Sequence, residues 1–130
     1  MGWDEEVEGR TRARFHETVK IQKIVLVATG GWWELGNFGT VVRIAEELAK
    51  DASVEFAGAI LRPHASLMKD NPKKETEILT ATKTAGTQLV KDGTFSPDVL
   101  QAIGQPLIDQ EDLRKRYNAY YEKITRKTKK

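Results

Sequence analysis

One short stretch constrains the fold of this chain more than any other. Residues 24–28 form an unbroken apolar run rich in β-branched side chains, and Gly30-Gly31 follow it closely. Such a run is typical of a strand buried on both faces of a parallel sheet. Residues 38–50 then carry an amphipathic pattern that predicts a helix. Strand, glycine-containing loop and helix together indicate the βα unit of a doubly wound sheet, whose ligands bind beyond the carboxyl ends of the strands.

The chain continues with one further strand and three further helices. Residues 54–61 predict the second strand, in which Gly58 indicates a bulge or a close backbone approach. Arg62-Pro63-His64 should end this strand, because Pro63 has no N–H for the ladder. Helices with apolar stripes are expected at about 73–92, 97–103 and from 109 onward, and capping residues precede the last two of them. The predicted order is therefore β-α-β-α-α-α.

Residues 1–19 predict a polar N-terminal arm in front of this pattern, and residues 20–130 hold all of its strands and helices. Arg10, Arg12 and Arg14 lie in the arm and are suited either to contact an anion or to form a solvated face. The solvated face is the favoured reading.

Composition narrows the range of functions. The formal net charge of +2 is too small to indicate nucleic acid or a membrane surface as a partner. The absence of cysteine excludes disulfides, thiol nucleophiles and cysteine-held metal clusters. The two histidines, His16 and His64, have no metal-ligand spacing around them, so no metal is expected. An acidic start and the lack of a long apolar stretch favour a cytoplasmic protein.

Two parallel strands are too few for a complete sheet of this class, since most sheets have about four to six. A strand as apolar as residues 24–28 needs neighbours on both edges and helices on both faces. The sequence therefore predicts an α/β fold that is half of a doubly wound parallel sheet. Another chain or oligomerisation should complete it, as a homo-oligomer or with a chain that supplies the other half.

Three motifs carry a resemblance to a known family. They are Ala28-Thr29-Gly30-Gly31-Trp32-Trp33-Glu34, then Asn37-Phe38, then Leu61-Arg62-Pro63-His64. Their order and spacing resemble the C-terminal half of flavodoxin-like NAD(P)H-dependent FMN reductases, including the multimeric flavodoxins. One branch of that family has a Ser-Thr-Cys-Gly-Phe-Trp-Glu-like loop, an Asn-Phe pair and a strand ending in Leu-Arg-Pro-His. The resemblance implies a flavodoxin-like fold and an electron-transfer subunit that uses FMN, with NAD(P)H as substrate.

Two departures from the family pattern bear on the cofactor. The family's phosphate-binding loop follows its first strand and has no counterpart in these residues. FMN affinity depends strongly on its phosphate, so the resemblance implies weak FMN binding unless a partner chain supplies that loop. Gly30 replaces the loop cysteine of this branch. The alternative function is a non-catalytic flavodoxin-like interaction module that has lost flavin.

The resemblance places the cofactor site at the loop after the first strand, in Thr29, Gly30, Gly31, Trp32, Trp33 and Glu34. The tryptophans either stack on the flavin ring or pack under the loop, and one of each is expected. Glu34 has two candidate partners, a flavin edge and, as the favoured one, a loop backbone N–H. Arg62 and His64 are candidates for contact with a nucleotide phosphate or an acidic partner residue, although a structural hydrogen bond is favoured for His64. No residue is assigned a catalytic role, because the cofactor performs the redox chemistry in flavin enzymes.

Both strands should point the same way, which brings their carboxyl-end loops to one edge of the sheet. The tryptophan loop and the Arg62-Pro63-His64 segment are therefore expected to be neighbours, independently of any family.

Overall fold

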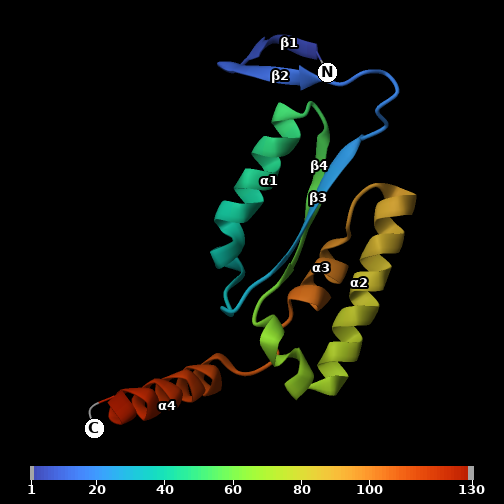
Figure 1. The fold of residues 1–130 in the computed structure, drawn as a ribbon. Coiled ribbons are helices and arrows are strands. Elements are labelled where there is room, and N and C mark those ends of the chain that lie inside the picture. The colour runs from blue at the N-terminus through green and yellow to red at the C-terminus, as the bar shows by residue number, and fades with distance from the viewer. Residues whose placement is uncertain (1, 129–130) are drawn as a thin grey trace.

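The computed structural model describes residues 2–128 (Figure 1). Along the chain, the strands and helices have the following bounds: β1 Gly2–Val7, β2 Arg10–Arg14, β3 Lys23–Thr29, α1 Gly39–Asp51, β4 Glu55–Arg62, α2 Pro72–Asp92, α3 Pro97–Gly104 and α4 Gln110–Thr128. Two short 3-10 helices, η1 Leu35–Phe38 and η2 Ala65–Asp70, precede α1 and α2. The fold is α/β, and the predicted β-α-β-α-α-α order is confirmed for the part that begins at β3.

Strands β3 and β4 form the parallel pair that the sequence predicts. The register moves from Ile24 opposite Phe56 to Val25 opposite Gly58, which leaves Ala57 as the extra residue of a bulge. Gly58 has φ +126°, and a Cβ placed on it would lie 3.0 Å from the Phe95 ring. The expected bulge is therefore present, and glycine permits both the backbone angle and the close packing of Phe95.

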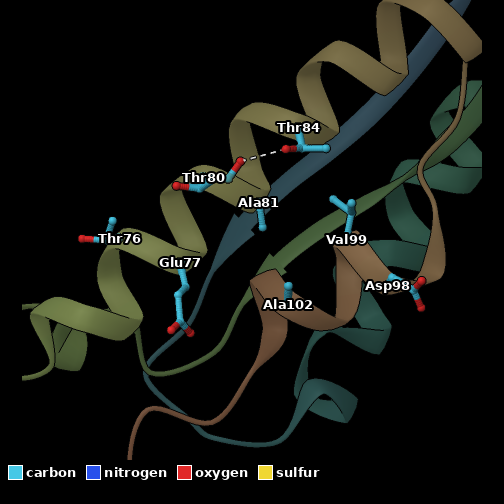
Figure 2. A pocket seen from close by; sticks show the side chains of 8 residues that line it. All are labelled: Thr76, Glu77, Thr80, Ala81, Thr84, Asp98, Val99 and Ala102. Atoms are coloured by element: carbon cyan, nitrogen blue, oxygen red, sulfur yellow. Dashed lines mark hydrogen bonds between the residues drawn. The ribbon is translucent and has the colours of Figure 1, made fainter.

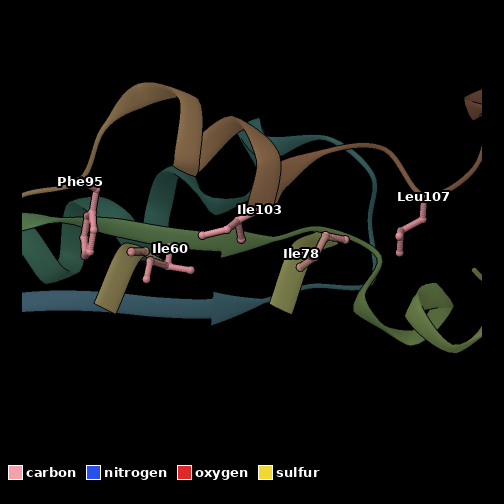
Figure 3. Packing of buried hydrophobic residues seen from close by; sticks show 6 residues of the cluster. Ile60, Ile78, Phe95, Ile103 and Leu107 are labelled. Atoms are coloured by element: carbon pink, nitrogen blue, oxygen red, sulfur yellow. The ribbon is translucent and has the colours of Figure 1, made fainter. Parts of the chain in front are cut away.

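Helices cover both faces of the strand pair, with α1 on one side and α2 with α3 on the other (Figure 1). The main core lies on the α2–α3 side and joins β4 to both helices (Figure 3). Its buried members are Ile60, Ile78, Ala85, Phe95, Ile103 and Leu107. The apolar stripe predicted for residues 73–92 faces this core, since Ile78 and Ala85 are buried there.

The expectation that residues 24–28 are buried on both faces is wrong for this chain. Val27 in β3 is 66% exposed, and its neighbours are only half-buried. The physical reason is that β3 pairs with β4 alone among residues 2–128. The apolar stripe predicted for α1 is likewise only partly buried. Ala45 and Ala49 are buried, whereas three larger side chains remain exposed: Val41, Ile44 and Leu48.

The first residues, for which the sequence predicts a polar arm without a strand, form a β-hairpin. Strands β1 and β2 are antiparallel, and both residues between them, Glu8 and Gly9, have positive φ. Two such residues form the turn that suits the twist of a hairpin. Arg12 is buried and forms an ion pair with Asp51 at 2.8 Å, while Arg10 pairs with Glu47. These arginines therefore dock the hairpin on α1, and the favoured reading of a solvated face is wrong for Arg12.

The later helices end where the sequence predicts, with one difference in how α3 begins. Gly93 ends α2 in the left-handed conformation, with φ 71°. Ser96 and Pro97 start α3, but the Ser96 hydroxyl accepts a hydrogen bond from Gln88 Nε2 at 3.0 Å instead of capping the helix. Asp109 Oδ1 accepts from the backbone N–H of Glu111 at 2.8 Å and so caps α4. From there α4 projects away from the rest of the fold (Figure 1).

Candidate functional site at the tryptophan loop

The loops after β3 and β4 meet at one edge of the sheet, as the parallel arrangement predicts. Three backbone hydrogen bonds join them. Gly30 N–H donates to Arg62 O at 3.0 Å, His64 N–H donates to Trp32 O at 3.0 Å, and Ala65 N–H donates to Gly30 O at 3.2 Å. The tryptophan loop, residues 29–34, is thus fixed to the second loop by its main chain.

The two glycines of this loop have different roles. A Cβ on Gly30 would lie 2.8 Å from Phe38 Cζ, so the buried Phe38 ring leaves no room for a side chain. A Cβ on Gly31 would meet nothing within 4 Å, and this residue is exposed. Gly30 therefore serves packing, while Gly31 leaves the backbone of the loop open to a ligand. Thr29, at the end of β3, is also exposed.

The two tryptophans line a pocket between the loop and the part of α4 from Arg114 to Tyr121. Its volume is about 490 Å³, within the range of small-molecule sites. We call it the aromatic pocket, and it is lined by Gly31, Trp32, Trp33, Arg114, Tyr117, Asn118 and Tyr121. The indole rings meet edge to face, with centroids 6.1 Å apart and planes at 77°.

The two indoles differ in their surroundings. Trp32 is 62% exposed, whereas Trp33 is half-buried beneath the Arg114 guanidinium, whose carbon lies 5.3 Å from the Trp33 ring centre. Within residues 2–128, the buried Nε1 of Trp33 has no hydrogen-bond partner. Both rings border the pocket, and Trp33 also packs beneath the arginine.

Glu34 ties the tryptophan loop to α4. Its Oε2 accepts from Asn37 Nδ2 at 3.1 Å, and its Oε1 accepts from Gln110 Nε2 at 3.4 Å. The carboxylate therefore bonds with two side-chain amides rather than with the backbone N–H that was favoured. This contact helps to place α4 beside the loop.

Arg62 points into the protein. Its Nε donates to Pro63 O at 2.7 Å, its Nη2 donates to Gln105 O at 2.7 Å, and its Nη1 donates to Ile103 O. The bonds to Gln105 O and Ile103 O satisfy carbonyls at the C-terminal end of α3, a favourable place for a cation. Burial lowers the pKa of Arg62, although a guanidinium remains protonated at neutral pH. In this structure the side chain holds α3 against β4 and presents no free edge to a phosphate.

His64 is also internal, with 1% of its surface exposed. Its φ of 37° is in the left-handed region, where its backbone N–H reaches Trp32 O. Burial, followed by the charges of Arg62 and Lys74, lowers the pKa of its imidazole, which is therefore neutral at pH 7. Its Nδ1 has no partner among the described residues. The hydrogen bond of His64 to the loop is made by its backbone, and the structural hydrogen bond favoured for its side chain is not made by Nδ1.

A second hollow of about 430 Å³ lies between α2 and α3 (Figure 2). Figure 2 shows Ala81, Val99 and Ala102 facing one another along it. The hydroxyls of Thr76 and Thr84 donate to carbonyls of their own helix, at 3.0 and 3.1 Å. These two hydroxyls are satisfied within their own helix, and the facing side chains are apolar, so we interpret the hollow as a packing groove between the helices.

Sequence reasoning missed the contribution of α4 to the site. The pocket residues Arg114, Tyr117, Asn118 and Tyr121 recur at spacings of three and four, which is one face of a helix. The same helix also carries large apolar and aromatic residues at helical spacing on another face: Leu113, Tyr117, Tyr120 and Ile124. Of those four, only Leu113 is buried.

No cluster of acidic residues and histidines suited to a metal ion occurs in the described part of the chain. Over the same residues, no helix combines the length and the apolar character needed to cross a membrane. Comparisons with known protein families, with characterised proteins and with solved structures give no significant match to this chain.

Proposed function

We propose that this chain is the C-terminal half of a flavodoxin-like flavoprotein that transfers electrons between NAD(P)H and FMN. The observation that carries the proposal is the edge of the sheet where the two loops meet. Parallel strands end there beside an open glycine and two indoles, the position at which doubly wound folds bind their ligands. The motif resemblance supplies the identity of the ligand.

In this proposal the flavin ring lies against the tryptophan loop. The exposed backbone at Gly31 allows N–H groups to approach the polar rim of the ring, and an indole covers or flanks one face. Thr29 and Glu34 border the same edge. The side chains of Arg62 and His64 are buried and are not placed to reach a nucleotide. In this proposal they support the edge of the sheet from inside.

The second part of the proposal is that another chain, or another copy of this one, completes the sheet. Among the described residues, the outer edge of β3 has no partner strand. Large apolar side chains are also exposed on β3 and α1: Val27, Val41, Ile44 and Leu48. Unpaired strand edges and contiguous apolar surface are features that a partner covers. If the completing chain is a different polypeptide, it would also carry the phosphate-binding loop, which a second copy of this chain would not supply.

Co-expression with the polypeptide encoded by the neighbouring gene tests both parts. We expect a stable complex whose absorbance spectrum shows bound flavin, and a Trp32→Ala or Trp33→Ala complex that binds FMN about ten- to a hundredfold more weakly. The Tyr120→Ala complex is the matched control, since Tyr120 is exposed but does not line the pocket. A colourless complex that does not respond to added FMN would favour the alternative, a non-catalytic interaction module.

A further inference from the structure

We propose that the aromatic pocket is a binding site for a planar aromatic anion, such as an aromatic carboxylate. This inference does not depend on the flavin assignment. It rests on three properties of the pocket: which surfaces form its walls, how its rings are exposed, and what charge it carries.

The walls come from segments far apart in the chain. One is the tryptophan loop, fixed by its hydrogen bonds to residues 62–65. The other is α4, whose N-terminal end is held by the buried Leu113 and by the contact of Gln110 with Glu34. The hollow between them is therefore a consequence of the tertiary structure, with a volume suited to a small molecule.

The rings that line the pocket are unusually exposed. Trp32, Tyr117 and Tyr121 have 62%, 44% and 69% of their surface accessible. Because Trp32 and Trp33 meet edge to face, neither indole covers the other by stacking. Flat apolar faces thus remain available, and a planar ring can stack on them.

The charge in the pocket favours a ligand of negative charge. Arg114 is the one charged side chain among the lining residues, and within residues 2–128 it forms no ion pair. Its neighbours in α4 do form such pairs: Lys115 with Glu111 at 3.0 Å, and Arg116 with Asp70 at 3.6 Å. A guanidinium stacked on an indole keeps its N–H edge free for a carboxylate. Asn118 adds a further hydrogen-bonding group.

Titration calorimetry with three small probes tests this inference: naphthalene-2-carboxylate, naphthalene-2-methanol and cyclohexanecarboxylate. We expect the aromatic carboxylate to bind at least about tenfold more tightly than either the uncharged ring or the non-planar anion. In NMR spectra it should shift the indole N–H signals of Trp32 and Trp33.

Matched variants in α4 locate the site. Arg114→Gln should weaken naphthalene-2-carboxylate about tenfold, whereas Arg116→Gln, which alters a neighbouring arginine that does not line the pocket, should leave it unchanged. Tyr121→Ala should weaken binding and Tyr120→Ala should not. Equal affinity for the acid and the alcohol would overturn the proposal, as would equal effects of the paired variants. Indole signals that shift with protein concentration but not with the probe would also overturn it, and would assign the pocket to a second copy of the chain.

FMN binding by the co-expressed complex is a separate measurement. A colourless complex with intact naphthalene-2-carboxylate binding would refute the flavin proposal alone. Failure of naphthalene-2-carboxylate to bind the FMN-free chain would refute only the inference about the pocket, whatever the colour of the complex.

Discussion

Replacing Arg62 by methionine tests whether this side chain is a structural clamp or a ligand for phosphate. The change keeps an apolar stem of similar length and removes the donors to Pro63 O, Ile103 O and Gln105 O. Hydrogen bonds from a charged donor contribute about 1.5–3 kcal/mol each, and bonds within one network do not add fully. We expect Arg62→Met to lower the free energy of unfolding by about 3–5 kcal/mol.

Urea unfolding followed by circular dichroism and tryptophan fluorescence measures this loss. Arg62→Lys should recover only part of the stability, because an ammonium group cannot reproduce the planar fork that reaches three carbonyls. Arg43→Met is the control. Arg43 is exposed on α1, and its replacement should change the stability by no more than about 0.5 kcal/mol.

A loss below about 1 kcal/mol for Arg62→Met would refute the clamp. The guanidinium would then be available for the nucleotide contact that the sequence suggested. If the variant does not fold at all, the Arg62→Lys protein carries the comparison with Arg43→Met.

Three further predictions concern the same edge of the sheet. Gly30→Ala should cost about 1–3 kcal/mol in urea unfolding, because its Cβ would overlap the Phe38 ring, whereas Gly31→Ala should be nearly neutral; equal costs would contradict the packing argument. The folded-state pKa of His64 lies below its unfolded value of 6.5, so the unfolded chain binds more protons beneath that value. The contribution of His64 to the free energy of unfolding should therefore be fully present above about pH 6.5, and it should be lost as the pH falls from that value towards the folded-state pKa. In urea unfolding at several pH values, His64→Asn, which tolerates the left-handed backbone, should flatten this dependence; an unchanged slope would assign it to other groups. Sedimentation equilibrium at tens of micromolar should detect an oligomer if a second copy covers the exposed apolar residues of β3 and α1, and a compact, cooperatively folded monomer would count against such self-association.

The βα unit, the bulge and the helix ends were accessible from the sequence because each depends on local chemistry. Gly58 and Gly93 mark backbone angles that other residues rarely adopt, and Ser96-Pro97 marks a helix start. The convergence of the two loops also followed, since it requires only that the strands be parallel.

The errors arose where burial or pairing depends on distant residues. An apolar run indicates what a strand requires, and it does not reveal whether this chain provides the covering surface, so the exposure of Val27 was not foreseen. The polar composition of the first residues concealed a hairpin whose arginines pair with Glu47 and Asp51. The aromatic pocket escaped notice because the direction of α4 is set by contacts such as Gln110 with Glu34.

The way α4 is attached has a mechanical consequence. Its buried anchor, Leu113, lies in the first turn, while Tyr120, Tyr121 and Ile124 in the second half are exposed. Helix α4 is thus anchored near its N-terminal end and is less constrained toward its C-terminal end. The opposite wall of the aromatic pocket is held in place by three main-chain hydrogen bonds. Because Arg114 is next to the anchor and Tyr121 is about two turns further along, a small tilt of α4 changes the distance between Tyr121 and the indoles far more than the distance between Arg114 and Trp33. If the pocket binds an aromatic anion as proposed, we expect it to distinguish ligands by their charge at Arg114 more sharply than by their thickness beside Tyr121.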